Sequence, residues 1–169
     1  HDQEADWHRG LALIRAAGFS PAGMAAPFGT WTPALAEVID RLGLTYSSEF
    51  SYAYDTVPMM PYLPAQTVRT LQVPVHPVST GSLRRAGFST CHMKEYFIAA
   101  ADALLARDLP LFFYHHPTQH IPGVFEALFE HVRTLGIVPI RMDDMARWWL
   151  GRSALKPSLR IDGDVLEVG

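Results

Sequence analysis

Cysteine is nearly absent from this sequence, which has a single one, Cys91, among 169 residues. One cysteine excludes an intrachain disulfide and any zinc site that needs several cysteines. No catalytic signature surrounds Cys91, so we expect it to be a small buried or half-buried packing residue. The composition, 49% hydrophobic and 18% charged, is that of an ordinary globular domain with one core.

Concentrated positive charge and long apolar runs are missing as well. The sequence has 14 Lys and Arg against 17 Asp and Glu, and Arg84–Arg85 is its one adjacent basic pair. A nucleic-acid surface needs clustered Lys and Arg, and a membrane-spanning helix needs about 20 apolar residues. We therefore expect a soluble chain with neither a nucleic-acid nor a membrane partner. The start lacks a signal-peptide pattern, which leaves the compartment open and slightly favours the cytoplasm.

The spacing of the apolar residues predicts helices that alternate with short strands. We expect helices over 6–17, 32–42, 94–106, 124–135 and 143–150, and strands over 22–28, 44–49, 71–75, 109–115 and 137–141. Thr32 and Pro33 suit the N-cap and the first turn of the second helix. Such alternation with short links indicates an α/β fold with parallel strands.

Two segments break this alternation. Residues 51–70 are too rich in proline for a regular helix or a central strand, and we expect a long loop over the rim of the sheet. At the other end, Asp162–Gly163 lies between alternating apolar residues, which predicts a β-hairpin. We therefore divide the chain into a domain over 1–152 and a C-terminal hairpin, or the start of a further module, over 153–169.

Histidines follow two of the predicted strands. The apolar run 109–114 ends in His115 and His116, and His76 follows the strand at 71–75. Functional groups of α/β folds lie at the carboxyl ends of parallel strands. We expect His76 and His116 to emerge at the same end of the sheet.

Three segments, taken in order, resemble a known family. They are 23–29 (Gly-Met-Ala-Ala-Pro-Phe-Gly), 42–48 (Leu-Gly-Leu-Thr-Tyr-Ser-Ser) and 113–117 (Phe-Tyr-His-His-Pro). Their order and spacing resemble the carboxyl-terminal part of the polysaccharide deacetylases, the fourth carbohydrate esterase family. The resemblance covers most of residues 11–149. It implies a partial or distorted (β/α) barrel that lacks its first strands.

The resemblance also implies an activity and a set of site residues. The family hydrolyses N- or O-acetyl groups of carbohydrates with water activated by a divalent metal, for which zinc is the first choice. His116 corresponds to the acid that protonates the leaving group. His1 would be the remnant of the metal-binding histidine pair, although it is equally explained as a leftover terminal residue. Contacts to the acetylated carbohydrate are expected from Phe28, Trp31, Glu49, His76, Tyr114 and His115.

Each of these residues also has a plainer interpretation. His116 and His76 would be structural histidines at the rim, and Glu49 a loop hydrogen-bonding group. Phe28 and Trp31 would be core aromatics, and we interpret Trp148–Trp149 as packing. His115 and His120 would form a metal site unlike that of the family only if Pro117 allowed them to approach one another.

The sequence also departs from the family. Its early aspartate pair is missing, and Asp143–Asp144 is better explained as favourable charge in the first turn of the last helix. Ala25 stands where the family has an arginine, whose bidentate contacts a methyl group cannot replace. We therefore expect this chain alone to be inactive.

Three function classes stay open. The chain is part of a longer or assembled deacetylase, completed by the missing N-terminal part of the barrel or by a homo-oligomer. Alternatively, it is a catalytically degenerate domain that binds carbohydrate or a protein. An unrelated α/β hydrolase is disfavoured, because no Gly-x-Ser-x-Gly elbow occurs and Ser79-Thr80-Gly81 lacks the flanking glycine and helix.

Overall fold

A computed structural model describes residues 3–64, 66–116, 118, 121–156, 158–162 and 165–168. Its parallel sheet has three short strands, β1 (Gly23–Met24), β2 (Tyr46–Ser47) and β5 (Leu71–Gln72), in the order β1-β2-β5. Gly23 is opposite Tyr46, and Tyr46 is opposite Leu71. The predicted parallel pairing is confirmed for these three strands.

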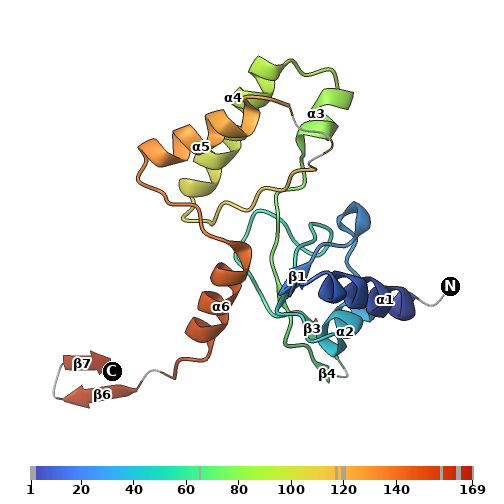
Figure 1. Ribbon diagram of the computed structural model, residues 1–169. Helices are drawn as coiled ribbons and strands as arrows, with labels where there is room; N and C mark the ends of the chain where they lie inside the picture. The colour runs from blue at the N-terminus through green and yellow to red at the C-terminus, as the bar shows by residue number, and fades with distance from the viewer. Residues whose placement is uncertain are drawn as a thin grey trace.

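Two helices pack against the first strand. α1 (Gln3–Ala16) and α2 (Pro33–Arg41) contribute to a core cluster that contains Leu11 and Ile39, with Met24 of β1 against it. The predicted cap of α2 is confirmed, because Leu35 N–H donates to the Thr32 hydroxyl at 3.1 Å. Figure 1 shows both helices in the half of the molecule that holds the sheet and the N-terminus.

The proline-rich segment 51–70 is a loop over most of its length, as predicted. It contains one short antiparallel pair, β3 (Tyr62–Leu63) with β4 (Gln66–Thr67). Met59 and Gln72 of β5 exchange backbone hydrogen bonds of 3.0 and 2.8 Å. The loop therefore runs along the edge of β5 and leaves that strand paired on both sides.

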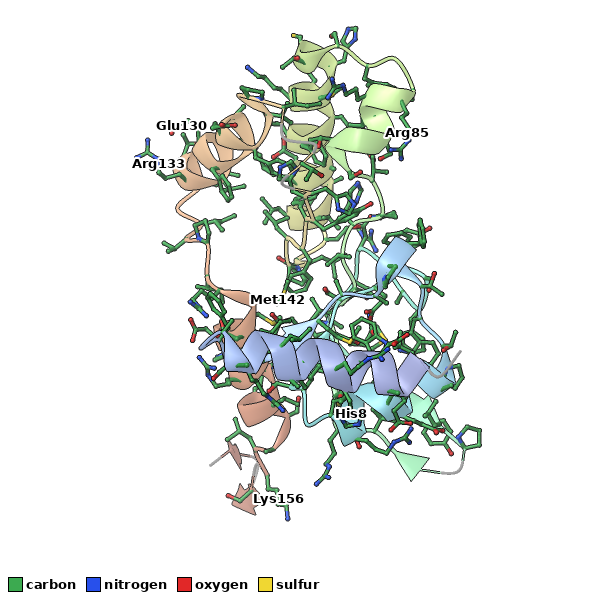
Figure 2. All side chains as sticks on the ribbon, turned by 45° about the vertical axis from the view of Figure 1, so that its right-hand side comes forward. His8, Arg85, Glu130, Arg133, Met142 and Lys156 are labelled. Carbon is green, nitrogen blue, oxygen red and sulfur yellow. The ribbon has the colours of Figure 1, made fainter. Side chains whose placement is uncertain are left out.

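The other half of the molecule consists of α3 (Thr80–Arg85), α4 (Thr90–Leu105) and α5 (Val124–Thr134). Their apolar sides form one core cluster around Phe97, with Leu83 from α3 and Leu128 from α5. Polar residues lie on the outside. Figure 2 shows Glu130 and Arg133 on the outer side of α5, where they form an ion pair of 2.7 Å.

The sequence patterns did not predict α3. Ser79 begins it with a capping box, in which Ser82 N–H donates to the Ser79 hydroxyl at 3.2 Å and Ser79 N–H donates to the Ser82 hydroxyl at 2.8 Å. The expectation that no helix follows Ser79 is therefore wrong. With six residues, α3 is too short to show an apolar period.

Two predicted strands, at 109–115 and 137–141, are not strands in the part of the chain that the structure describes. Pro110 and Pro139 each remove a backbone donor from these segments. Both segments line one apolar cavity of about 850 Å³, to which residues of α5 and α6 also contribute. The segment 109–115 still contacts the chain that continues from β5, because the backbone N–H of His76 donates to Phe112 C=O at 2.7 Å.

The last helix, α6 (Met142–Ser153), packs against β5 and the residues that follow it. Met145 and Ala146 pack with the buried Leu71, Val73 and Val75. Beyond α6, β6 (Leu159–Asp162) pairs antiparallel with β7 (Val165–Val168), and Figure 1 shows the pair at the end of the molecule. Gly163 of the predicted turn lies outside the described residues.

Two packing predictions need correction. Cys91 is exposed on α4, where its thiol donates to Glu95 at 3.4 Å, so it is not a buried packing residue. Trp149 packs against the core as predicted, whereas Trp148 is 59% exposed. The guanidinium of Arg152 lies 5.8 Å from the ring centroid of Trp148 and 5.0 Å from that of Trp149, so both rings form cation–π contacts with this side chain.

None of the helices in the described part of the chain is long and apolar enough to cross a membrane.

Candidate functional site

Four of the predicted site residues, His76, Tyr114, His115 and His116, lie where the segment after β5 meets the segment that carries the paired histidines. We call residues 76–80 and 112–116 the rim. His76 N–H donates to Phe112 C=O at 2.7 Å, and the Tyr114 hydroxyl donates to Pro77 C=O at 3.5 Å. The two segments therefore lie side by side although more than 30 residues separate them in sequence.

His116 lies at the exposed end of the rim. The Tyr114 ring is edge-on to its imidazole, with centroids 5.5 Å apart, and Tyr114 itself stacks on Phe50 at 5.9 Å. Tyr114 is half-buried and belongs to the apolar packing around β5. It supports one side of His116 and leaves the imidazole open to solvent.

His115 points into a different environment from its neighbour. Its Nδ1 lies 3.4 Å from the Thr80 hydroxyl of α3, and its ring centroid is 5.0 Å from that of Phe125 on α5. The side chain also borders the apolar cavity described above. His115 and His116 are thus adjacent in sequence but do not share a set of contacts.

His76 is buried and held at both ring nitrogens. Nδ1 lies 2.9 and 3.0 Å from the two carboxylate oxygens of Asp55, and Nε2 lies 3.0 Å from the Tyr96 hydroxyl. The sequence pattern predicts no role for Asp55 or Tyr96. Asp55 lies in the proline-rich loop and Tyr96 in the middle of a helical pattern, so no spacing in the sequence links them to His76.

Glu49 follows β2, and its side chain is fully buried. One carboxylate oxygen accepts a hydrogen bond from Ala26 N–H at 2.8 Å, within the segment 23–29. Gln72 donates to the Glu49 carbonyl at 3.0 Å and accepts from the Ser47 hydroxyl at 3.0 Å. Burial raises the pKa of the Glu49 carboxyl, and these hydrogen bonds only partly oppose that shift.

The Glu49 network has a direct structural effect: it fixes the loop that follows β1. Its proposed contact with a sugar hydroxyl stays a prediction.

The two predicted stacking aromatics differ in exposure. Phe28 is 92% exposed and has a left-handed backbone, with φ of 59°. Trp31 is half-buried against Tyr52, with ring centroids 4.3 Å apart. A fully exposed aromatic ring in a strained turn can stack on a flat sugar face, whereas Trp31 already has a stacking partner.

The described residues do not fit a metal ion. Among them, no three His, Cys, Asp or Glu side chains come together in a way that would hold one. His1, the predicted ligand, lies outside the described residues. Asp55 and His76 are one carboxylate and one imidazole, and they are hydrogen-bonded to each other.

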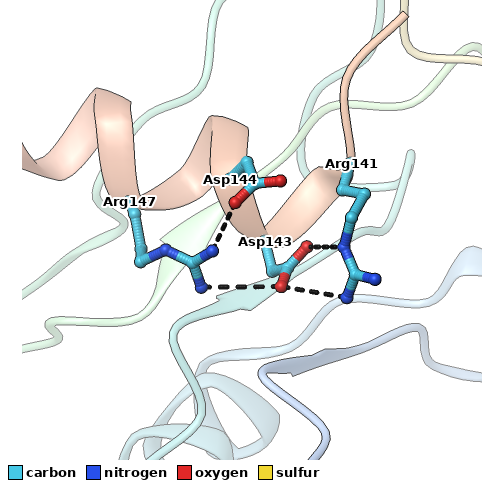
Figure 3. A network of polar contacts seen from close by, with 4 residues as sticks. All are labelled: Arg141, Asp143, Asp144 and Arg147. Carbon is cyan, nitrogen blue, oxygen red and sulfur yellow. Dashed lines mark hydrogen bonds and ion pairs between the residues drawn. The ribbon is translucent and has the colours of Figure 1, made fainter.

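Asp143 and Asp144 form ion pairs at the start of α6, as expected for first-turn charges. Asp143 accepts from Arg141 at 2.9 Å, and Arg147 lies 3.5 Å from Asp143 and also pairs with Asp144 (Figure 3). The hydrogen bond from Arg141 is the main reason that the pKa of Asp143 is lowered to about 2. These carboxylates are therefore engaged in surface ion pairs.

Comparisons with known proteins show which solved structure this fold is similar to. No protein-family model matches the chain, and no curated protein matches it. The structure is similar to the crystal structure of a protein described as a putative polysaccharide deacetylase from Mycobacterium smegmatis. The TM-score is 0.68 at 18% sequence identity, and the match covers 96% of this chain and 61% of that chain.

The likeness shows the fold: helices around a parallel sheet, similar to a polysaccharide deacetylase. This chain spans less than two thirds of the length of the solved protein. At this level the fold expected from the three sequence segments is confirmed.

Proposed function

We propose that this chain forms the histidine-bearing part of a hydrolase that removes N- or O-acetyl groups from a carbohydrate. The observation that carries the proposal is the position of His116 at the exposed end of the rim, in a fold similar to that of a polysaccharide deacetylase. The three sequence segments that resemble the family support the same assignment. Phe28 and Tyr114 supply further aromatic groups for a sugar.

His116 is the proposed acid. An imidazole exchanges a proton close to neutral pH, and its exposed position gives a leaving amine or alcohol access to the ring. When the bond between the acyl carbon and the leaving atom breaks, a ring nitrogen of His116 donates its proton to that atom. The contact with the Tyr114 ring limits the orientations that the imidazole can take.

The deacetylation proposed here uses water on a divalent metal, and the described residues do not supply its ligands. We therefore derive no step through a metal from this chain. In an active deacetylase, residues other than those described, from a longer polypeptide or a second subunit, would hold the metal.

A second candidate function is carbohydrate binding without hydrolysis. It is favoured by Ala25, which stands where the family has an arginine, and by Glu49, whose carboxylate is used to hold the backbone of Ala26. A domain with these features could keep the sugar-binding surface after losing the reaction.

The test measures acetate release from N-acetylated oligosaccharides, using the longest polypeptide that carries these residues. His116→Ala should reduce turnover by about 10²-fold or more, because general acid catalysis contributes about 10²–10⁴-fold. His8→Ala is the matched control, since His8 is an exposed histidine on α1 and belongs to neither segment of the rim. It should leave turnover unchanged, and His120→Ala should have a much smaller effect than His116→Ala.

The His116→Ala variant and the control variant should both have the melting temperature of the unchanged protein. If the His116→Ala variant had the same turnover as the unchanged protein, His116 would have a structural role and not a catalytic one. In that case binding of the oligosaccharide without acetate release would support the non-hydrolytic function.

A further inference from the structure

Three titratable side chains from three separate parts of the fold meet at the exit of β5. Asp55 comes from the proline-rich loop, His76 from the segment after β5, and Tyr96 from α4. The two carboxylate oxygens of Asp55 lie 2.9 and 3.0 Å from Nδ1 of His76, and the Tyr96 hydroxyl lies 3.0 Å from Nε2. The acid role proposed for His116 uses none of these groups.

The Asp55 carboxylate determines where the protons lie in the hydrogen bonds that join Asp55, His76 and Tyr96. An ionised carboxylate accepts hydrogen bonds and donates none, so Nδ1 of His76 must carry the proton that it shares with Asp55. In the neutral ring, Nε2 is then an acceptor, and the Tyr96 hydroxyl is its donor. Burial raises the pKa of Tyr96, and the charge of Asp55 raises it further, so the hydroxyl keeps the proton that it donates.

His76 and Tyr96 differ in burial, and therefore in whether they can contact a ligand. The His76 side chain is 8% exposed, and its ring is enclosed by Tyr96 and by Phe113, whose centroid is 5.3 Å away. With both nitrogens hydrogen-bonded, His76 has no remaining polar atom for a ligand. Tyr96 is half-buried, and its oxygen still has lone pairs after donating its one proton to His76.

We propose that Asp55, His76 and Tyr96 form a hydrogen-bond relay that makes the Tyr96 hydroxyl oxygen a dedicated acceptor for a donor group of the substrate. The donor would be an amide N–H or a hydroxyl of the N-acylated carbohydrate, and this substrate class rests on the proposed function. Tyr96 touches the substrate, whereas Asp55 and His76 are positioning residues that act through it.

The relay is connected to the rim that carries His116. The backbone of His76 donates to Phe112, and the adjacent Pro77 accepts from Tyr114, two residues before His116. Asp55 is held for this contact by an uncommon left-handed backbone, with φ of 51°. Such strain in a non-glycine residue persists where the surrounding contacts enforce it.

The relay itself is tested without any substrate, by ¹⁵N NMR of the histidine rings. At a pH where the ring is neutral, His76 should show a protonated Nδ1 and an unprotonated Nε2. Asp55→Ala removes the acceptor of the Nδ1 proton and should move part of the population to the other tautomer. A His76 ring already protonated at Nε2 in the unchanged protein would overturn the relay.

The acceptor role is tested by binding of the N-acetylglucosamine trimer, measured by calorimetry. Tyr96→Phe removes one hydrogen bond and should weaken binding about 3- to 10-fold, since a net hydrogen bond is worth about 0.5–1.5 kcal/mol. Asp55→Ala should also weaken binding, because a proton on Nε2 would donate to the Tyr96 oxygen and compete with the substrate donor for it. Tyr54→Phe is the matched control, in the same loop as Asp55 and 57% exposed, and should bind unchanged.

The two proposals fail in different ways. Trimer binding that is equal in the Tyr96→Phe variant and the unchanged protein would overturn the acceptor role and leave the proposed function standing. If the unchanged protein does not bind the trimer, the substrate class falls together with the proposed function. The tautomer of His76 then still decides whether the relay exists.

Discussion

At the scale of single residues, the fully buried Glu49 carboxyl makes the most specific prediction about stability. Burial raises its folded pKa above the unfolded value of about 4.3. The folded protein therefore binds this proton more tightly than the unfolded chain does. The resulting stability is fully present below about pH 4 and is lost as the pH rises through the folded pKa of Glu49.

Glu49→Gln keeps the shape of the side chain and removes this titration. The stability of the variant relative to the unchanged protein should therefore increase as the pH rises from about 4 to 8. Urea unfolding at a series of pH values measures the difference. A difference that stays constant over this range would show that Glu49 does not titrate differently in the folded state.

Gly29 is a second residue whose identity is fixed by its surroundings. Its φ is +61°, and an added Cβ would overlap the ring of Phe50. Gly29→Ala should lower the free energy of unfolding by about 1–3 kcal/mol, the usual cost of forcing extra atoms into a packed site. Gly10→Ala is the control, because Gly10 lies within α1 with open space around it. It should raise stability by about 0.5–1 kcal/mol.

At the scale of elements, the start of α6 is sensitive to acid. The hydrogen bond from Arg141 lowers the pKa of Asp143 to about 2, below the unfolded value of about 3.9. The stability from this pair is present above about pH 4 and is lost as the pH falls towards 2. Asp143→Asn and Arg141→Gln should each reduce that loss.

The double variant tests whether the two residues act as a pair. Circular dichroism of thermal unfolding between pH 2 and 5 should show the same pH dependence for Asp143→Asn alone as for both changes together. Fully additive effects would mean that the ion pair of Figure 3 does not form in solution.

The elements also show what the sequence can predict about this fold. The five expected helices are present, since each has an apolar period, and α2 has the predicted cap at Thr32. α3 was missed because six residues are too few for a period. The segments 109–115 and 137–141 were predicted as strands because they are apolar. Pairing, however, depends on neighbours and on the prolines Pro110 and Pro139, which a local pattern weighs poorly.

The sequence named candidate site residues only where they follow an expected strand or resemble a family motif. His116 and His76 were named from their positions after apolar runs. Asp55 and Tyr96 were not, because their contact with His76 joins residues about 20 positions apart on either side of it. Such a contact is created by the folding of the loop and α4 around β5.

At the scale of the whole molecule, the 169 residues by themselves should release little acetate from an N-acetylated oligosaccharide. The described residues bring no three metal ligands together, and Ala25 stands where the family that the sequence resembles has an arginine. The assay measures acetate with added zinc and again with a chelator. Rapid release that the chelator abolishes would show that the chain holds its own metal.

The central claim is that the rim recognises an N-acylated carbohydrate. It is tested most directly by titrating the protein with the N-acetylglucosamine trimer while recording the NMR signals of all its histidine rings. The account predicts that His116 and His115 shift in proportion to the occupied fraction, and that His76 responds through Tyr96. The rings of His8, His92 and His131 should not move. No change at the rim at saturating trimer, or changes confined to His8, His92 and His131, would contradict the claim.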